Sequence, residues 1–312
     1  MKNLVASIQD RLKNFSRMEG VTLNLVLEDY ANSRLFARLS ASRHRDDFIL
    51  KGAQLFKLWS DTPHRPTRDA DFLSFGPAEP EVLKSTFEEI CGAATSPPDG
   101  LAWTVGQVAP IREDNLYGGV RIKLAAHLGN MRIPAQIDVG FGDAITPEAE
   151  TAEWKMPLDF PSVPLLVYRP AATIAEKLQA AVELGTANSR MKDFYDLHWL
   201  SLHHAFAGKH LQAAVDATFQ RRGTDRPQET PVAFTNRFHE LPDKQTQWKA
   251  FLRKSSLQAP SFEQTIQRIS DFLLPVLLDE VSGSHWHPET GWTQGSSLFS
   301  KPRGHSRAPE AF

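Results

Sequence analysis

Two aspartates separated by one residue are the clearest sign of chemistry in this 312-residue chain. Asp69 and Asp71 open a stretch, residues 69–75, in which polar and apolar residues alternate as in a β-strand. Because alternate side chains of a strand share a face, the two carboxylates should lie roughly 6 to 7 Å apart on one side. Such a pair can hold two divalent ions, which stabilise the attacking and leaving oxygens in phosphoryl or nucleotidyl transfer. A solvated strand edge can carry the same acidic pair without any such function.

Two other segments could complete a site of this kind. Lys51, Gly52 and Ala53 open a predicted helix, and a glycine turn there can direct backbone N–H groups at a phosphate. A simple helix start would have the same sequence. Asp138 lies between two apolar residues of another predicted strand, so its carboxylate should face solvent or a cleft, since an unpaired buried charge is costly.

The elements that must position these residues follow from hydrophobic periodicity. Apolar spacing of three or four residues predicts helices over 4–15, 21–39 and 81–90, and alternation predicts strands over 69–75, 102–108, 119–128 and 131–141. The tight Gly129-Asn130 junction suits a hairpin between the last two strands. After an apolar stretch at 164–168, five helices are predicted over 171–184, 193–204, 211–219, 236–253 and 262–278.

These patterns predict an α+β protein with a small mixed sheet, helices around it and a helical C-terminal domain. The expected parts are an N-terminal helical arm (1–47), a mixed core (48–168), a helical C-terminal domain (169–281) and a flexible tail (282–312) rich in Gly, Ser, Pro and His. Trp286 and Trp292 in that tail could stack on a base or hold the tail in place by packing.

Composition excludes several classes of protein. The 35 basic and 37 acidic residues give a formal charge of −2, so any contact with nucleic acid must be local. The single cysteine, Cys91, cannot form an intramolecular disulfide or a Cys-rich metal site. The longest apolar runs are far shorter than a membrane span, and charges interrupt the N-terminal segment where a secretion signal needs an apolar core. We therefore expect a cytoplasmic protein without a membrane partner.

The order of the chemical motifs resembles a known arrangement. A glycine turn, a spacer, D-x-D and a later strand aspartate form the pattern of the DNA polymerase β-like nucleotidyltransferases. In this chain Gly52 and Ala53 are followed, after fifteen residues, by Asp69 and Asp71, and then by Asp138. Ala53 replaces the usual second Gly or Ser, which keeps the amide and loses a hydroxyl.

A closer resemblance is to the AbiEii/AbiGii family of nucleotidyltransferase toxins, which includes the MenT-type toxins. That family shows L-K-G-G, R-x-T-x-D-x-D, a strand Asp, A-E-K-L-x-A on a helix, and R-x-K-D-x-x-D-L. The matching blocks are Leu50-Lys51-Gly52, Arg65-Pro66-Thr67-Arg68-Asp69-Ala70-Asp71, Asp138, Ala175-Glu176-Lys177-Leu178-Gln179-Ala180 and Arg190-Met191-Lys192-Asp193-Phe194-Tyr195-Asp196-Leu197.

The resemblance implies roles for these positions. Asp69, Asp71 and Asp138 would hold Mg²⁺ or Mn²⁺, and Asp138 could instead act as the base toward a hydroxyl. Lys177 would balance the charge of the triphosphate or of pyrophosphate, with Glu176 in a supporting or ion-pair role. The residues expected to bind the nucleotide are Lys51, Gly52, Ala53, Arg68, Lys177, Arg190, Lys192 and Asp196. Asp193 is expected to be catalytic or, with Asp196, to hold Lys177 or Lys192 in place; capping of a helix N-terminus would explain both acids equally well.

The activity implied is transfer of NMP from an NTP to an acceptor hydroxyl, with the 3′ end of tRNA as the expected acceptor. Similar proteins are toxins of toxin–antitoxin or abortive-infection phage-defence systems, encoded beside a winged-helix antitoxin. Local basic clusters that could contact RNA are Arg43-His44-Arg45, Arg221-Arg222 and Lys249 with Arg253-Lys254. Two alternatives remain open: a protein or small-molecule acceptor, and a non-catalytic nucleotide-binding protein.

Overall fold

The computed structural model describes residues 2–60, 62, 64–111 and 118–294. Its longer helices are α1 (Lys2–Glu19), α2 (Leu23–Ala41), α4 (Pro80–Gly92), α5 (Pro170–Leu184), α6 (Met191–His203), α7 (Gly208–Arg221), α9 (Pro242–Ser255) and α10 (Phe262–Leu277). The short ones are α3 (Phe56–Trp59), α8 (Asn236–His239) and the 3-10 turns η1 (Gly52–Leu55), η2 (Pro157–Asp159), η3 (Gly185–Ala187) and η4 (Val232–Phe234). In these parts of the chain, no helix has both the length and the apolar character that a membrane crossing requires.

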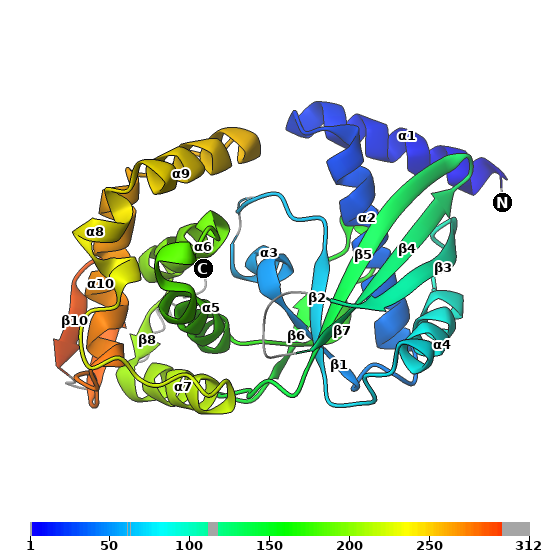
Figure 1. Cartoon of the computed structure of the whole chain (residues 1–312). Coiled ribbons are helices and arrows are strands. Elements are labelled where there is room, and N and C mark those ends of the chain that lie inside the picture. The colour runs from blue at the N-terminus through cyan, green and yellow to red at the C-terminus, as the bar shows by residue number, and fades with distance from the viewer. Residues whose placement is uncertain (1, 61, 63, 112–117, 295–312) are drawn as a thin grey trace, which may run out of the picture.

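Seven strands form one mixed sheet in the order β3-β4-β5-β2-β1-β7-β6. They are β1 (Phe48–Lys51), β2 (Ala70–Ser74), β3 (Leu101–Pro110), β4 (Gly119–Leu128), β5 (Met131–Phe141), β6 (Glu150–Trp154) and β7 (Val163–Val167). β2 pairs with β5 in parallel and with β1 antiparallel, so the two short strands lie at the centre. Helices α5 to α10 gather beside this sheet (Figure 1). This is the mixed α/β core with a helical C-terminal half that the sequence predicts.

Helix α2 belongs to the core of the sheet. Its residues Leu35, Phe36 and Leu39 are buried together with apolar side chains of β1, β2, β4 and β5. Two arginines of the same helix reach Asp99, which is buried in the connection between α4 and β3. The boundary expected at residue 47 therefore separates α2 from a sheet with which it shares one hydrophobic core.

The helical half has its own core, built from α5, α6, α7, α9 and α10. Helix α3 contributes Phe56, which packs into this second core and so joins it to the chain segment after β1. The single helix expected over 236–253 is wrong: the chain forms α8 and then α9, which starts at Pro242. Proline lacks a backbone N–H and disfavours a helical residue before it, so it begins a helix more readily than it continues one.

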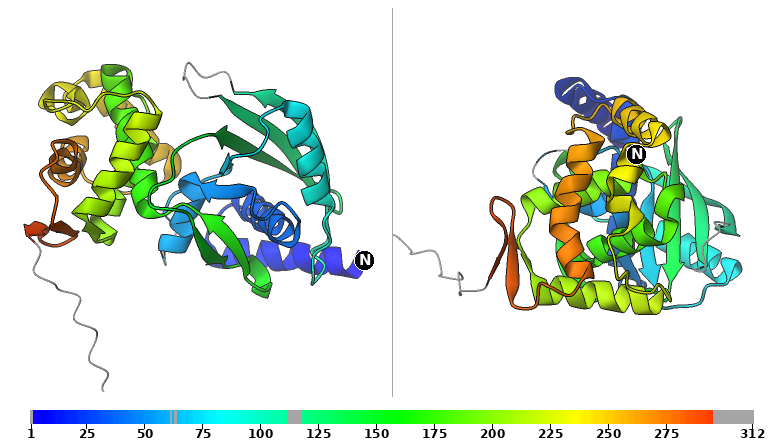
Figure 2. Two further views of the ribbon diagram at one scale, coloured as in Figure 1. Left: turned by 90° about the horizontal axis from the view of Figure 1, so that it is seen from below. Right: turned by 60° about the vertical axis from the view of Figure 1, so that its left-hand side comes forward.

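The flexible tail expected from residue 282 is wrong for its first part. Strands β9 (Ser284–His287) and β10 (Gly291–Gln294) form an antiparallel hairpin that also pairs with β8 (Phe206–Ala207). Trp286 is 1% exposed, and its Nε1 donates a hydrogen bond to the Ser201 carbonyl 2.9 Å away. The hairpin lies against α10 at the outer side of the helical half (Figure 2). The remaining tail, residues 295–312, lies outside the described residues.

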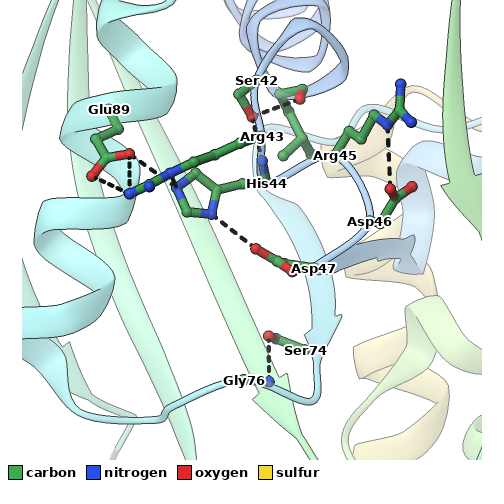
Figure 3. A network of polar contacts seen from close by, with 10 residues as sticks. Ser42, Arg43, His44, Arg45, Asp46, Asp47, Ser74, Gly76 and Glu89 are labelled. Atoms are coloured by element: carbon green, nitrogen blue, oxygen red, sulfur yellow. Dashed lines mark hydrogen bonds and ion pairs between the residues drawn. The ribbon is translucent and has the colours of Figure 1, made fainter.

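The basic cluster Arg43-His44-Arg45, which could contact RNA, is paired with acids of the protein. Arg43 and His44 both contact Glu89 of α4, and His44 Nδ1 lies 2.8 Å from Asp47 (Figure 3). These contacts attach the loop between α2 and β1 to α4. The loop lies at the end of β1 opposite Lys51.

Candidate active site

Four charged residues form a row across the centre of the sheet. The strand register places Lys51 of β1 opposite Asp71 of β2, Asp71 opposite Asp138 of β5, and Asp138 opposite Arg121 of β4. Directly opposed residues of neighbouring strands turn their side chains to the same face. The sheet therefore brings two carboxylates together between two cations, although the four residues are spread over positions 51 to 138 of the sequence.

Asp71 lies within β2, whereas Asp69 lies directly before it, because the strand spans Ala70–Ser74 and not residues 69–75 as expected. Burial raises the pKa of Asp71 to about 6, against the pull of the Lys51 ammonium and with a further rise from the Asp138 carboxylate. Burial and then Asp138 also raise the pKa of Asp69, while Arg121 opposes the rise. Carboxylates whose charges are disfavoured in this way form a site that gains from an added cation.

Gly52 lies directly against the Asp71 carboxylate. Its φ is +73°, a conformation that residues with a side chain rarely adopt. A Cβ at this position would lie 2.1 Å from Asp71 Oδ2, which is less than a van der Waals contact. Only glycine satisfies both the backbone turn into η1 and the close approach to the acid.

A cavity of about 540 Å³ connects the row with the helical half. Its lining includes ten of the twelve expected site residues: Lys51, Gly52, Ala53, Asp69, Asp71, Asp138, Lys177, Arg190, Lys192 and Asp193. Asp71 and Asp138 belong to the sheet, and Asp69 directly precedes β2. In contrast, Lys177 comes from α5, Lys192 and Asp193 come from α6, and Arg190 directly precedes α6. The cavity is thus shared by both halves of the molecule.

Lys177 is held between two carboxylates of α6. Its Nζ donates to Asp193 Oδ1 at 2.5 Å and lies 2.9 Å from Asp196 Oδ2. Burial alone would lower the pKa of Lys177, but the two carboxylates outweigh it and raise that pKa. Of the two lysines considered as partners for these acids, both acids contact Lys177. Arg190 binds the other oxygen of Asp193 at 2.6 Å, which fixes that carboxylate as well.

Asp196 lies behind this pair and does not line the cavity. It is fully buried and accepts two hydrogen bonds from Arg65, at 2.7 and 2.8 Å. His64 Nε2 lies 2.8 Å from the same carboxylate, and the His64 ring stacks on Phe56. Asp196 therefore anchors the loop before β2 to α6. His64 was missed in the sequence, because its partner is 132 positions away.

A second network holds Lys51. Its Nζ lies 2.9 Å from Asp143 Oδ2 and 2.8 Å from Glu176 Oε1, so the ion-pair role expected for Glu176 is confirmed. Arg222 of the segment after α7 also binds Asp143, with contacts of 3.2 Å. Asp143 follows β5 and was missed in the sequence, where it resembles any polar loop residue.

Two residues that were expected to bind the nucleotide, Arg68 and Lys192, lie in different positions relative to the cavity. Arg68 is outside the cavity lining, and its guanidinium pairs with Glu28 of α2 at 3.2 Å. Lys192 is exposed, lines the cavity and has no ion pair with any described residue within 4 Å. Its positive charge lowers the pKa of both Asp69 and Asp71 relative to burial alone. Lys192 is therefore the cavity cation best able to receive an anionic ligand, whereas Arg68 is not placed to do so.

The acids suit a hard divalent cation by donor type, since Mg²⁺ and Mn²⁺ prefer carboxylate oxygens. Asp69 and Asp71 would hold the ion, because burial disfavours the negative charge of both carboxylates. Asp138 accepts two hydrogen bonds from Arg121 at 2.8 and 2.7 Å, so its oxygens are already engaged. Among residues 2–60, 62, 64–111 and 118–294, no three His, Cys, Asp or Glu side chains are arranged to hold a metal.

Comparison with known protein families identifies the family of the chain. Residues 34–268 match the family model described as the nucleotidyl transferase AbiEii toxin of type IV toxin–antitoxin systems. The chain belongs to this family, which implies a nucleoside triphosphate substrate and an antitoxin partner.

Two solved structures from Helicobacter pylori are similar to the chain. One is a proposed nucleotidyltransferase, with 15% identity, a TM-score of 0.45 and coverage of 81% of this chain and 94% of that one. The other is JHP933, with 15% identity, a TM-score of 0.45 and coverage of 82% and 91%. A comparison with curated proteins gives no match.

Proposed function

We propose that this protein is a toxin that transfers NMP from an NTP to an acceptor hydroxyl and releases pyrophosphate. One observation carries the proposal: the acids of the sheet and the lysines of α5 and α6 line the same cavity. Acids that gather a cation and cations that gather phosphate are the two charge patterns that nucleotidyl transfer needs. A volume of about 540 Å³ is in the range of small-molecule sites.

Each group has a role in this reaction. Asp69 and Asp71 would bind Mg²⁺ or Mn²⁺, which supplies charge stabilisation at the reacting oxygens. Asp138 accepts the proton of the acceptor hydroxyl while the new bond to the α-phosphorus forms and the bond to pyrophosphate breaks. Lys192 receives phosphate charge directly. Lys177 is already balanced by Asp193 and Asp196, so it contributes a fixed rather than a mobile charge.

The acceptor we propose is the 3′ end of tRNA, with a winged-helix antitoxin encoded nearby and a cytoplasmic site of action in phage defence. The support in this chain is an exposed basic face on α9, made of Lys249, Arg253 and Lys254. Lys249 and Arg253 are four residues apart and share one side of the helix. Such a face suits the phosphate backbone of RNA.

The test is transfer from α-labelled NTPs in the presence of Mg²⁺, with bulk tRNA and protein extract as competing acceptors. We expect label on tRNA, removable with its 3′ nucleotides, and no label with the double variant Asp69→Asn/Asp71→Asn. Label on protein would show that the acceptor is a protein and not tRNA, while the proposed transferase activity would stand. Equal NTP binding by wild type and the double variant, with no transfer by either, would contradict the proposed transferase activity.

Lys192 provides a sharper variant because it lies at the surface of the fold. Lys192→Ala should leave thermal unfolding unchanged and raise KM for NTP by about tenfold, which corresponds to one lost charge-assisted contact. Lys192→Arg should restore most of that KM. Arg68→Ala is the matched control, because Arg68 is also exposed but pairs with Glu28 and is not in the lining of the cavity. An equal rise in KM in this control would contradict the role of Lys192.

A further inference from the structure

Arg121 holds the carboxylate that the proposed reaction needs. Its Nε and Nη2 donate to the two oxygens of Asp138 at 2.8 and 2.7 Å, a bidentate pair of the kind that fixes geometry most firmly. The pair is built into the sheet, since the two residues face each other in the register of β4 and β5. The side chain of Asp138 is 18% exposed and that of Arg121 is 38% exposed. Both line the cavity.

This contact sets up a competition. A divalent ion between Asp69 and Asp71 would lie near Asp138, but both oxygens of Asp138 are engaged by Arg121. Two cations close to one carboxylate repel each other. The acid row therefore accepts a divalent ion poorly as long as Arg121 stays in place.

A triphosphate resolves the competition. Guanidinium binds phosphate oxygens with the same planar fork that it uses for carboxylates, and Arg121 already lines the cavity that a nucleotide would enter. An anionic ligand there competes with Asp138 for the guanidinium of Arg121, so the carboxylate of Asp138 becomes available when the nucleotide arrives.

We propose that Arg121 is a nucleotide-released counter-ion of Asp138, which makes divalent ion and NTP bind cooperatively. Arg121 acts through Asp138 and is therefore a positioning residue. The inference rests on the proposed function, because it takes an NTP and a divalent ion as the ligands of the cavity. Coupling between two ligands is reciprocal, so each raises the affinity of the other by the same factor.

The experiment measures Mn²⁺ binding by electron paramagnetic resonance, with and without an ATP analogue whose α,β-bridge cannot be cleaved. For wild type we expect weak binding alone and binding at least about tenfold tighter with the analogue, a typical coupling factor. Arg121→Gln should bind Mn²⁺ more tightly than wild type without the analogue and should lose most of the gain. Arg121→Lys, which keeps the charge but not the fork, should retain an intermediate gain.

Controls separate the possible failures. Arg132→Gln changes an exposed arginine of β5 outside the cavity and should behave as wild type, and thermal unfolding verifies that each variant is folded. If Arg121→Gln and wild type show the same Mn²⁺ affinity and the same gain, while Asp69→Asn/Asp71→Asn abolishes binding, the role of Arg121 is overturned and the proposed function stands. If wild type binds no Mn²⁺ under either condition, both are overturned.

Discussion

At the scale of single residues, the site depends on contacts that allow no substitute. Gly52 and Asp71 show this most clearly, because a side chain at position 52 would collide with the carboxylate of Asp71. The turn that begins η1 is therefore part of the acid site as well as a helix start.

Gly52→Ala should lower transfer activity by at least about 100-fold, because a displacement of about 1 Å in a reacting group is enough for such a loss. The strained φ should cost about 1–3 kcal/mol of unfolding free energy. Gly20→Ala is the matched control, since Gly20 has a φ of +65° with no atom within 4 Å of the added Cβ. Thermal unfolding and labelled-NTP turnover measure the two effects. Similar activity losses in both variants would show that strain, and not contact with Asp71, is responsible.

His198 gives a pH dependence of stability. Burial, and then the charges of Arg268 and His203, lower the pKa of His198 to about 4 in the folded protein. The unfolded chain therefore binds more protons between about pH 6.5 and 4, so stability should fall as pH falls through this window. His198→Gln should reduce the slope by up to about 1.4 kcal/mol per pH unit, measured by urea unfolding. The control His210→Gln, which changes an exposed histidine of α7, should leave the slope of unfolding free energy against pH unchanged. An unchanged slope in His198→Gln would contradict the role of His198.

At the scale of elements, two helices and a hairpin decide how the site is supported. Helix α6 brings Lys192 to the cavity and Asp193 and Asp196 to Lys177, because residues three and four apart share a helix face. Helix α5 supplies Glu176 and Lys177 side by side, and the two side chains reach different networks. The β9–β10 hairpin closes the far side of α10 and α6 through Trp286.

Trp286→Ala should destabilise the protein by about 3–5 kcal/mol, the usual cost of truncating a fully buried tryptophan. The expected reason is a cavity beside Phe272 and the loss of the hydrogen bond to Ser201. His285→Ala is the matched control, because His285 lies on the same strand with its side chain exposed. Chemical unfolding of both variants measures the difference, and an unaltered midpoint for Trp286→Ala would restore the interpretation of this segment as a loose tail.

At the scale of the whole molecule, the cavity is the place where the sheet and the helical half meet. The ion pairs of Lys51 with Glu176 and of Arg65 with Asp196 cross between them. A ligand in the cavity would contact both halves, and so should stabilise both at once.

Hydrogen exchange should show this directly. A Mg²⁺–NTP analogue at about 100 times its Kd should stabilise the fold by about 2.7 kcal/mol and should protect amides of β2 and of α5 and α6 together. The double variant Asp69→Asn/Asp71→Asn under the same conditions should gain no protection in either half. Protection confined to one half would show that the ligand does not bridge them.

Much of this protein was determined by the sequence alone, where the cause is local. The period of a strand places Asp69 and Asp71 on one side, and the glycine that begins η1 marks a turn that only glycine makes. The order of motifs sufficed to indicate the family, and hydrophobic spacing sufficed for most helices and strands. A proline in a predicted helix was the local signal that should have divided α8 from α9.

The pairing of charges follows from the folded chain and not from local sequence. Lys51 meets Asp143 and Glu176 across 92 and 125 positions, and Arg65 meets Asp196 across 131. Charged side chains look alike in a sequence, and their partners follow from strand register and helix packing. For this reason Arg121 on Asp138, Arg68 turned toward Glu28, and the burial of Trp286 could be found only in the folded chain.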